Sequence, residues 1–354
     1  MNSSASSSWR PPPEAELFEE YFDRLMALAR QRMEIEWSAH RRGDLQRLWP
    51  ELLELHREFG ALLRVVYRYG LTDVLRAEAR WYAAALGSRQ SPRDALALLL
   101  ESWIVAIEGL IPPPACHRLA EPLTALRGDL PALAVDMPRS SSPDAGVEKL
   151  VARSVAGDLA GAREVLRRRL AEGVPPYALV PDLLVAAMAE IGARWERNTL
   201  EIFREHLATE TVARLLAGLP AMVPAVPGLG RKALISAAPD DHIQIVPLAL
   251  AVYLELRGWT ACSLGHGLPA PQIAAAVEAL QPDAVFLSLA LVGRLRGALD
   301  TVERLARLPR RPLIVAGGRG ARLARAVLEA AGARVVDTFE QGHRLALGEG
   351  AGHA

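Results

Sequence analysis

The chain has 354 residues, of which 51% are hydrophobic and 23% charged, and its 41 basic side chains balance 41 acidic ones. This length predicts two or three domains, and the composition is that of a folded protein. A net charge of zero offers no broad positive field to a phosphate backbone, so we expect no nucleic-acid partner. Two cysteines argue against a disulfide framework and indicate a reducing compartment. Met1–Pro13 lacks an apolar leader, and no run of about 18 apolar residues occurs, so we expect a cytoplasmic protein with no membrane partner.

The first third of the chain predicts an all-α domain. After a Ser/Pro-rich tail over 1–13, which we expect to be disordered, residues 14–135 repeat apolar residues at three- and four-residue spacing. Gly70 and Gly87 mark helix ends, and Pro92 starts another helix. We interpret this segment as a dimerisation or signalling domain with an aromatic core, or as a pocket for a second chromophore. Five of the seven tryptophans lie in it: Trp9, Trp37, Trp49, Trp81 and Trp103.

Four more helical patterns follow a polar linker over 136–145. They cover residues 146–156, 158–172, 176–197 and 201–217. The loops between them are short, and short loops favour antiparallel neighbours. The sequence therefore predicts a four-helix bundle over 146–218, which a second linker rich in Pro and Gly separates from the rest.

From residue 231 onward the pattern alternates between short apolar strands and helices. Strands are predicted at 232–237, 260–264, 284–289, 313–316 and 335–336, and helices near 245–257, 271–280, 297–308 and 321–330. Such alternation is typical of a parallel sheet with helices on both faces. We therefore expect a Rossmann-like α/β domain over 231–348. Ligands of such sheets bind beyond the carboxyl ends of the strands, so residues after the strands are candidates for a site.

Three groups of residues follow strands at that edge. Asp240 and His242 come after the first strand, Ser288 ends the third, and Gly317-Gly318 follows the fourth. An imidazole can ligate a metal through one nitrogen while a carboxylate orients the other. The glycines permit close approach to a bulky ligand. A single histidine without a ligand cluster suits a metal already held in a macrocycle, although an Asp-x-His loop is also a common helix cap and Gly-Gly a common turn.

Together these elements resemble the cobalamin-binding domains of methionine synthases, mutases and light-responsive regulators. Those domains carry Asp-x-His-x-x-Gly after the first strand, Ser-x-Leu or Ser-x-Thr after the third, and Gly-Gly after the fourth. The resemblance implies that His242 is the lower axial ligand of cobalt and that the nucleotide tail of the cofactor lies beside the serine and the glycines. Ile245 stands where the family has glycine, and Ala290 or Leu291 stands in the position paired with Ser288.

The bundle adds a second resemblance. Trp195 is followed, after nine residues, by Glu205-His206, and this spacing is similar to the signature of adenosylcobalamin-dependent photoreceptors. The resemblance implies that Trp195 packs against the adenosyl group and that Glu205 and His206 line the upper face. Some members have a histidine directly after the tryptophan, which takes the vacated cobalt position after photolysis. Here Glu196 follows the tryptophan, which leaves His206 as the candidate upper ligand.

These resemblances predict a light sensor rather than an enzyme. Photolysis of the cobalt–carbon bond of adenosylcobalamin would change the domain arrangement and the homo-oligomeric state, and would signal through a partner that the sequence does not name. Photoreceptors of this kind without a DNA-binding domain, the photocobilins, also bind biliverdin, for which Cys116-His117 is the candidate attachment site. Two alternatives remain open: a corrinoid carrier subunit of a cobalamin-dependent methyltransferase, and a cobalamin-like fold that binds nothing.

Overall fold

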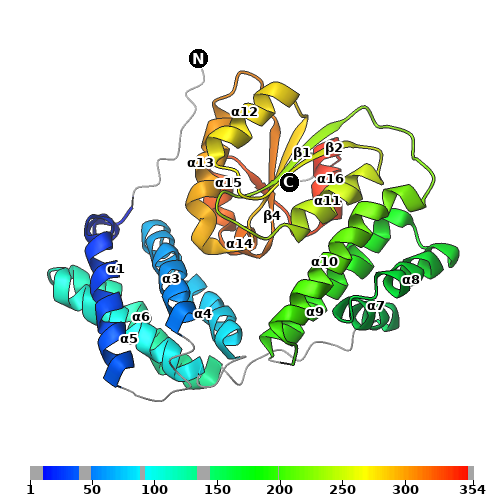
Figure 1. Cartoon of the computed structure of the whole chain (residues 1–354). Helices are drawn as coiled ribbons and strands as arrows, with labels where there is room; N and C mark the ends of the chain where they lie inside the picture. The colour runs from blue at the N-terminus through cyan, green and yellow to red at the C-terminus, as the bar shows by residue number, and fades with distance from the viewer. Residues whose placement is uncertain (1–10, 40–48, 88–91, 134–143, 198, 350–354) are drawn as a thin grey trace. The chain divides into compact units, whose positions relative to one another are not determined.

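The computed structural model describes two compact units (Figure 1). The described residues are 11–39, 49–87, 92–133, 144–197 and 199–349. One unit comprises Met1–Ser140 with Arg194–Thr199, and the other comprises Ser141–Ala193 with Leu200–Ala354. Most of the expected N-terminal tail and most of the first linker lie outside the described residues.

The elements described in the first unit are all helices, as predicted. Its helices are α1 (Pro13–Ala39), α3 (Trp49–Tyr69), α4 (Thr72–Gly87), α5 (Pro92–Leu110) and α6 (Ala115–Leu133). α3 ends before Gly70, whose φ of 66° is one that glycine adopts without steric cost. The Trp103 side chain is fully buried, with its ring centroid 6.2 Å from that of Phe18 and 5.4 Å from that of His56. An aromatic cluster therefore forms the core of this unit.

The bundle opens the second unit. It consists of α7 (Ala145–Val155), α8 (Leu159–Ala171), α9 (Ala186–Glu196) and α10 (Ile202–Gly218). The side chains of Asp144 and Asp158 cap α7 and α8 by accepting hydrogen bonds from the backbone N–H groups of Gly146 and Gly161.

The third predicted helix of the bundle, 176–197, is not a single α-helix. Pro176–Ala178 forms a 3₁₀ turn and Val180–Val185 a π-helical turn before α9 begins. Pro176 and Pro181 each lack a backbone N–H, so a regular ladder of hydrogen bonds cannot run through this stretch.

Pro176–Glu196 also bears on the expectation that the chain has no membrane span. By length and composition alone this stretch could cross a membrane, with a mean hydropathy of 1.3. However, Leu183, Leu184 and Ile191 are buried in the core of the bundle. A core helix of a folded domain has the same composition, so the hydropathy by itself decides nothing.

The α/β domain contains a five-stranded parallel sheet. Its strands are β1 (Lys232–Ala237), β2 (Thr260–Gly265), β3 (Ala284–Ser288), β4 (Leu313–Gly317) and β5 (Arg334–Val335), in the order β2-β1-β3-β4-β5. Its helices are α11 (Ile245–Glu255), α12 (Ala270–Leu280), α13 (Leu295–Ala306), α14 (Arg319–Leu323), α15 (Arg325–Ala330) and α16 (Phe339–Leu347). The predicted Rossmann-like fold is confirmed. The strand order reverses direction between β1 and β3, which is where sheets of this kind bind ligands.

Two features of this domain differ from the prediction. The helix expected over 321–330 is broken at Ala324, and α16 was not predicted. Gly342 interrupts the helical pattern of α16, yet a side chain there would come within 3.2 Å of the Phe286 ring. The glycine therefore costs helix propensity but lets α16 lie close against the sheet.

The bundle and the α/β domain share one hydrophobic core. It runs from Val212 and Leu216 of α10, through Val252 of α11, to Ile235 of β1. Figure 1 shows α10 lying along α11. This shared core fixes the face of the bundle that lies against the sheet domain, and so it positions the site described next.

Candidate functional site

The strand register brings the predicted residues to one edge of the sheet. Ala237 at the end of β1 pairs with Ser288, and Ser288 pairs with Gly317. Beyond the strands, the Ala238 N–H donates to the Ser288 carbonyl at 2.8 Å, and the Leu289 N–H donates to the Gly317 carbonyl at 2.9 Å. The loops after β1, β3 and β4 therefore meet at the reversal of strand order.

A pocket of about 580 Å³ lies between the bundle and this edge. We call it the upper pocket. Four predicted site residues line it: Glu205 and His206 from α10, His242 from the loop after β1, and Ile245 from the start of α11. The apolar part of its lining comes from Leu184, Val185, Met188, Ala189, Val212, Leu216, Ile243 and Val246.

Two polar side chains on the bundle side of the upper pocket differ in how firmly hydrogen bonds fix them. The Thr209 hydroxyl donates to Glu205 Oε1 at 2.8 Å, so Glu205 has a fixed partner. His206 Nδ1 lies 3.6 Å from Glu205 Oε2, and the His206 side chain is 74% exposed. The His206 imidazole is therefore largely in solvent, beside Glu205. Thr209 was not among the predicted residues, because its bond to Glu205 one helical turn earlier is visible only in the structure.

Trp195 lies in the last turn of α9 and is half-buried. It does not appear in the lining of the upper pocket. Its contact with an adenosyl group stays a prediction.

The loop after β1 is held by Asp241, a residue that the sequence analysis passed over. Its side chain is 1% exposed, and its carboxylate accepts hydrogen bonds from the Ala290 N–H at 2.7 Å and the Ile243 N–H at 3.1 Å. Asp241 thus ties the His242 loop to the loop after β3. It occupies the variable position of the Asp-x-His motif, so the motif gives no sign of it.

Asp240, the expected partner of His242, is exposed and has a φ of 62°. Among the described residues no hydrogen bond joins it to the imidazole. The ring that meets His242 is His266, edge-on with the centroids 6.1 Å apart. His266 directly follows β2, so the rule that pointed to the other strand ends could have found it.

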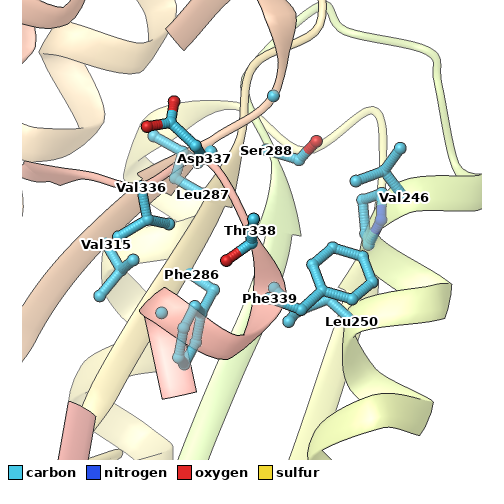
Figure 2. A pocket seen from close by; sticks show the side chains of 14 residues that line it. Val246, Leu250, Phe286, Leu287, Ser288, Val315, Val336, Asp337, Thr338 and Phe339 are labelled. Carbon is cyan, nitrogen blue, oxygen red and sulfur yellow. The ribbon is translucent and has the colours of Figure 1, made fainter. Parts of the chain in front are cut away.

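A second, narrower pocket lies deeper, between the sheet and two helices (Figure 2). We call it the sheet pocket; its volume is about 60 Å³. Ser288, Gly317 and Gly318 line it, and their place beside a nucleotide tail stays a prediction. The remaining lining is mainly apolar and includes Val246, Leu250, Phe286, Val315, Val336 and Phe339.

The residues predicted as partners of Ser288 act through their backbone. The Ala290 N–H donates to Asp241, and the Ala290 carbonyl accepts from the Gly320 N–H at 3.0 Å. Neither Ala290 nor Leu291 lines the sheet pocket.

The two predicted glycines have different roles. Gly318 has a φ of 107°, and a Cβ there would lie 2.5 Å from the Leu289 carbonyl oxygen. Close packing of the loops after β3 and β4 therefore requires this glycine, whatever the ligand. A Cβ at Gly317 would only make an ordinary contact at 3.8 Å with Val336. Gly317 is thus the one whose missing side chain leaves space in the sheet pocket.

The geometry fits a metal that arrives inside a macrocycle. His242 presents an exposed imidazole at the reversal of strand order, beside a wide pocket and close to a narrow one. Across the described residues no group of three or more His, Cys, Asp or Glu side chains is placed to hold a bare metal ion. One imidazole is a complete protein contribution only when the other ligands belong to the cofactor.

The predicted bilin residues lie in the first unit, at the start of α6. Cys116 is a free thiol and only 2% exposed, whereas His117 is exposed. A buried thiol is not presented for attachment. Biliverdin binding stays a prediction for which this geometry gives no support.

Comparison with known proteins decides the family. Residues 147–219 and 231–344 each match a family model described as a B12 binding domain. The chain belongs to the B12-binding family. The predicted resemblance to cobalamin-binding proteins is therefore confirmed, and the two matched segments contain the residues that line both pockets.

Two curated relatives come from Myxococcus xanthus. The HTH-type transcriptional repressor CarH is 28% identical over 280 residues, which cover 79% of this chain and 90% of CarH. The HTH-type transcriptional repressor CarA is 27% identical over 164 residues, which cover 46% of this chain and 55% of CarA. The B12-binding chain thus spans about half the length of CarA. Among solved structures, the monomethylamine corrinoid protein of Methanosarcina barkeri aligns with a TM-score of 0.48 and 19% identity, covering 56% of this chain and 96% of that protein.

The expectation that the chain has no nucleic-acid partner is wrong, because both relatives are transcriptional repressors of the HTH type. The error lay in reading a net charge of zero as the absence of any binding surface. Net charge is a sum over the whole chain, and a local group of basic side chains is compatible with a total of zero. The similarity to CarH also extends before residue 147, because the 280 matched residues outnumber those from there to the C-terminus.

Proposed function

We propose that this B12-binding chain is a light-dependent regulator of transcription, and not an enzyme, that senses light in the cytoplasm through adenosylcobalamin. One observation carries the proposal: Glu205 and His206 of the bundle line the same pocket as His242 of the sheet domain. This arrangement supports a site in which residues of the bundle and of the sheet domain would face opposite sides of one corrin ring. The similarity to the repressors CarH and CarA supports the regulatory role.

Each residue of the site would have its own role in binding the cofactor. His242 would hold the cobalt, and Asp241 keeps the His242 loop against the loop after β3. Glu205, fixed by Thr209, lines the opposite face. When bound, adenosylcobalamin supplies a cobalt–carbon bond that light cleaves.

The signal would arise in the bundle. Glu205 and His206 of α10 and His242 would line the space that takes the adenosyl group, so α10 and the His242 loop would be kept apart while it is filled; a contact from Trp195 is the prediction of the sequence. Once the pocket is vacated, its apolar lining is left in contact with water, which costs free energy in proportion to the apolar area exposed. The exposed His206 would then be able to turn into the pocket, and the bundle would move closer to the sheet domain. Loss of the adenosyl group would shift the equilibrium between the two positions of the bundle only by the difference in free energy between them.

A changed bundle position alters the surface of the protein, so we expect different homo-oligomeric states in dark and light. The experiment is size-exclusion chromatography with light scattering on the full chain loaded with adenosylcobalamin, dark and illuminated. The His206→Ala and Trp195→Ala variants should show a reduced change. Binding of DNA fragments, measured on the same samples, should differ between dark and light.

One size and one DNA affinity in both states, despite a light-altered spectrum, would contradict the signalling part of the proposal. The same samples would also test the alternative function, a corrinoid carrier of a methyltransferase. A carrier would hold methylcobalamin and pass its methyl group to a partner, with no change of size in light.

A further inference from the structure

The sheet pocket is too small for the group it is expected to hold. Its volume is about 60 Å³. A protein cavity that binds benzene measures about 150 Å³, and the base of a cobalamin nucleotide has two fused rings. Interiors are close-packed, so the missing volume must come from movement of the walls.

The walls that can move are two helices. Val246 and Leu250 of α11 line one side of the sheet pocket, and Phe339 of α16, preceded by Thr338, lines the other. Figure 2 shows Leu250 beside Phe339. The floor is the sheet itself, with Phe286 of β3. Because the strands are held by their ladders, the pocket widens most readily when α16 moves away from α11.

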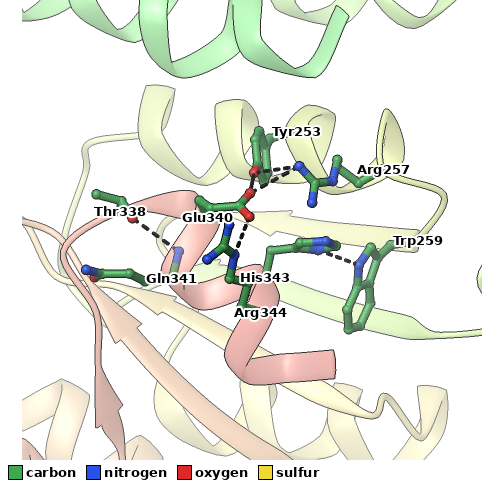
Figure 3. Close-up of polar contacts among 8 residues, drawn as sticks. All are labelled: Tyr253, Arg257, Trp259, Thr338, Glu340, Gln341, His343 and Arg344. Atoms are coloured by element: carbon green, nitrogen blue, oxygen red, sulfur yellow. Dashed lines mark hydrogen bonds and ion pairs between the residues drawn. The ribbon is translucent and has the colours of Figure 1, made fainter. Parts of the chain in front are cut away.

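A polar cluster joins α11 to α16 (Figure 3). The Tyr253 hydroxyl of α11 donates to Glu340 Oε2 of α16 at 2.6 Å. Arg257 Nη1 donates to the same oxygen at 3.1 Å. Glu340 follows Phe339 in the chain, so the fastening point adjoins the pocket wall.

The hydrogen bonds of this cluster stay formed at neutral pH. Hydrogen bonds from Tyr253 and then Arg344 lower the pKa of Glu340 to about 2, so its carboxylate is charged. The Tyr253 side chain is only 2% exposed, and hydrogen bonds to charged acceptors are stronger than neutral ones. One turn further along α16, His343 Nδ1 accepts a hydrogen bond from the Trp259 indole N–H at 3.0 Å.

We propose that Tyr253, Arg257 and Glu340 form a latch that holds α16 against α11 and controls entry of the cofactor's nucleotide tail into the sheet pocket. The inference rests on the proposed binding of cobalamin and adds residues that determine specificity. A corrinoid without a nucleotide tail does not need the pocket to open. The latch therefore acts only on corrinoids that carry one.

The test compares two ligands on the full chain in the dark: adenosylcobalamin, and adenosylcobinamide, which lacks the nucleotide tail. The association rate of each is followed by its change in absorption. Tyr253→Phe removes the bridging hydroxyl and keeps the ring, and Glu340→Gln removes the charge. Both should raise the association rate of adenosylcobalamin by about tenfold, the scale of one hydrogen bond to a charged group, and leave that of adenosylcobinamide unchanged.

Arg344→Gln is the matched control. Arg344 Nε donates to Glu340 Oε1 at 2.7 Å, but both residues lie on α16, so this pair does not bridge the helices. It should not change either rate. Arg257 is a poorer probe, because its guanidinium also lies 4.4 Å from the Tyr177 ring centroid.

Equal changes in the two rates, or no change in either, would overturn the latch while leaving cobalamin binding intact. A wild-type chain that binds neither ligand would contradict the proposed function itself, and the latch with it. Thermal unfolding of each variant checks that it is folded, and Tyr253→Phe alone is sufficient if Glu340→Gln does not fold.

Discussion

At the scale of single residues, two neighbouring aspartates have separate roles. Asp241 is buried and bonded to two backbone N–H groups, so it sets the path of the loop that carries His242. Asp240 is exposed, and among the described residues no hydrogen bond joins it to the His242 imidazole. The path of the loop therefore depends on Asp241, while the pairing of Asp240 with His242 stays a prediction.

His242→Ala should lower cobalamin affinity by at least about tenfold, since even outer partners of a metal ligand contribute 10- to 100-fold. It should also shift the absorption of the bound cofactor toward the form without a protein ligand. Asp240→Asn is the control and should change affinity less. Affinity and spectrum that match the wild type would rule out His242 as the ligand.

Ile245 replaces the family glycine at the first residue of α11, and it lines the upper pocket rather than the sheet pocket. We therefore expect Ile245→Gly to leave cobalamin affinity unchanged or to raise it, as measured by titration. Ile245→Ala separates the loss of the side chain from added backbone freedom. A large loss of affinity in both variants would show that the isoleucine packs against the cofactor.

At the scale of the elements, Gly318 and Gly317 offer a matched pair. Gly318→Ala should destabilise the protein by about 2–4 kcal/mol, because it adds a clash with the Leu289 carbonyl to a strained φ. The Gly317→Ala variant should fold normally, but its added methyl group should narrow the sheet pocket. It should therefore lower the affinity for cobalamin more than the affinity for a corrinoid without a nucleotide tail. Chemical denaturation and binding titrations measure the two effects. Equal stability of both variants would contradict the assignment.

Protonation of His343 should break its hydrogen bond with Trp259, the residue before β2, and so weaken the contact between α16 and that end of β2. Burial lowers the pKa of His343 below its ordinary value of 6.5, and its Nδ1 accepts from Trp259 only when unprotonated. The unfolded chain gains a proton below about pH 6.5 that the folded chain resists. The free energy of unfolding should therefore be full above that pH and fall as the pH drops below it.

His343→Gln keeps an acceptor for Trp259 but does not titrate, so urea unfolding between pH 7.5 and 5.5 should show a smaller decrease than in the wild type. His56 in the first unit also has its pKa lowered by burial and contributes its own decrease in both proteins. Identical slopes for the two proteins would exclude a contribution of His343.

The predictable elements were those with a strong local signal. Strands such as β1 and β3 are buried runs of apolar residues, so their ends were predicted to within a residue. The π-helical turn and α16 were missed, because one follows from prolines within a helical pattern and the other contains Gly342. Helical periodicity does not report either effect.

The site was predictable where the topology alone decides it. The rule for strand ends in a parallel sheet located His242, Ser288 and the glycines. It could not show which loop residue holds the others, because Asp241 acts through backbone groups far away in the sequence. It also could not show that Gly318 serves the packing of two loops.

At the scale of the whole molecule, the sequence pattern predicted the order of the domains, but composition did not predict a nucleic-acid partner. The elements described in the first unit are all helices, and the sequence predicted no DNA-binding motif among them; the similarity to the HTH-type repressors came from the comparison alone. A charge total averages over the whole surface and conceals local patches. Homology corrected a conclusion that composition could not support.

The central claim is that the pocket between α10 and the His242 loop holds adenosylcobalamin as a light sensor. The most direct test is the absorption spectrum of the full chain loaded with adenosylcobalamin in the dark, before and after green light. We predict that the cofactor stays bound through gel filtration in the dark and that its spectrum changes to that of a photolysed corrinoid on illumination. A chain that does not retain the cofactor, or whose bound spectrum is the same before and after light, would contradict the claim.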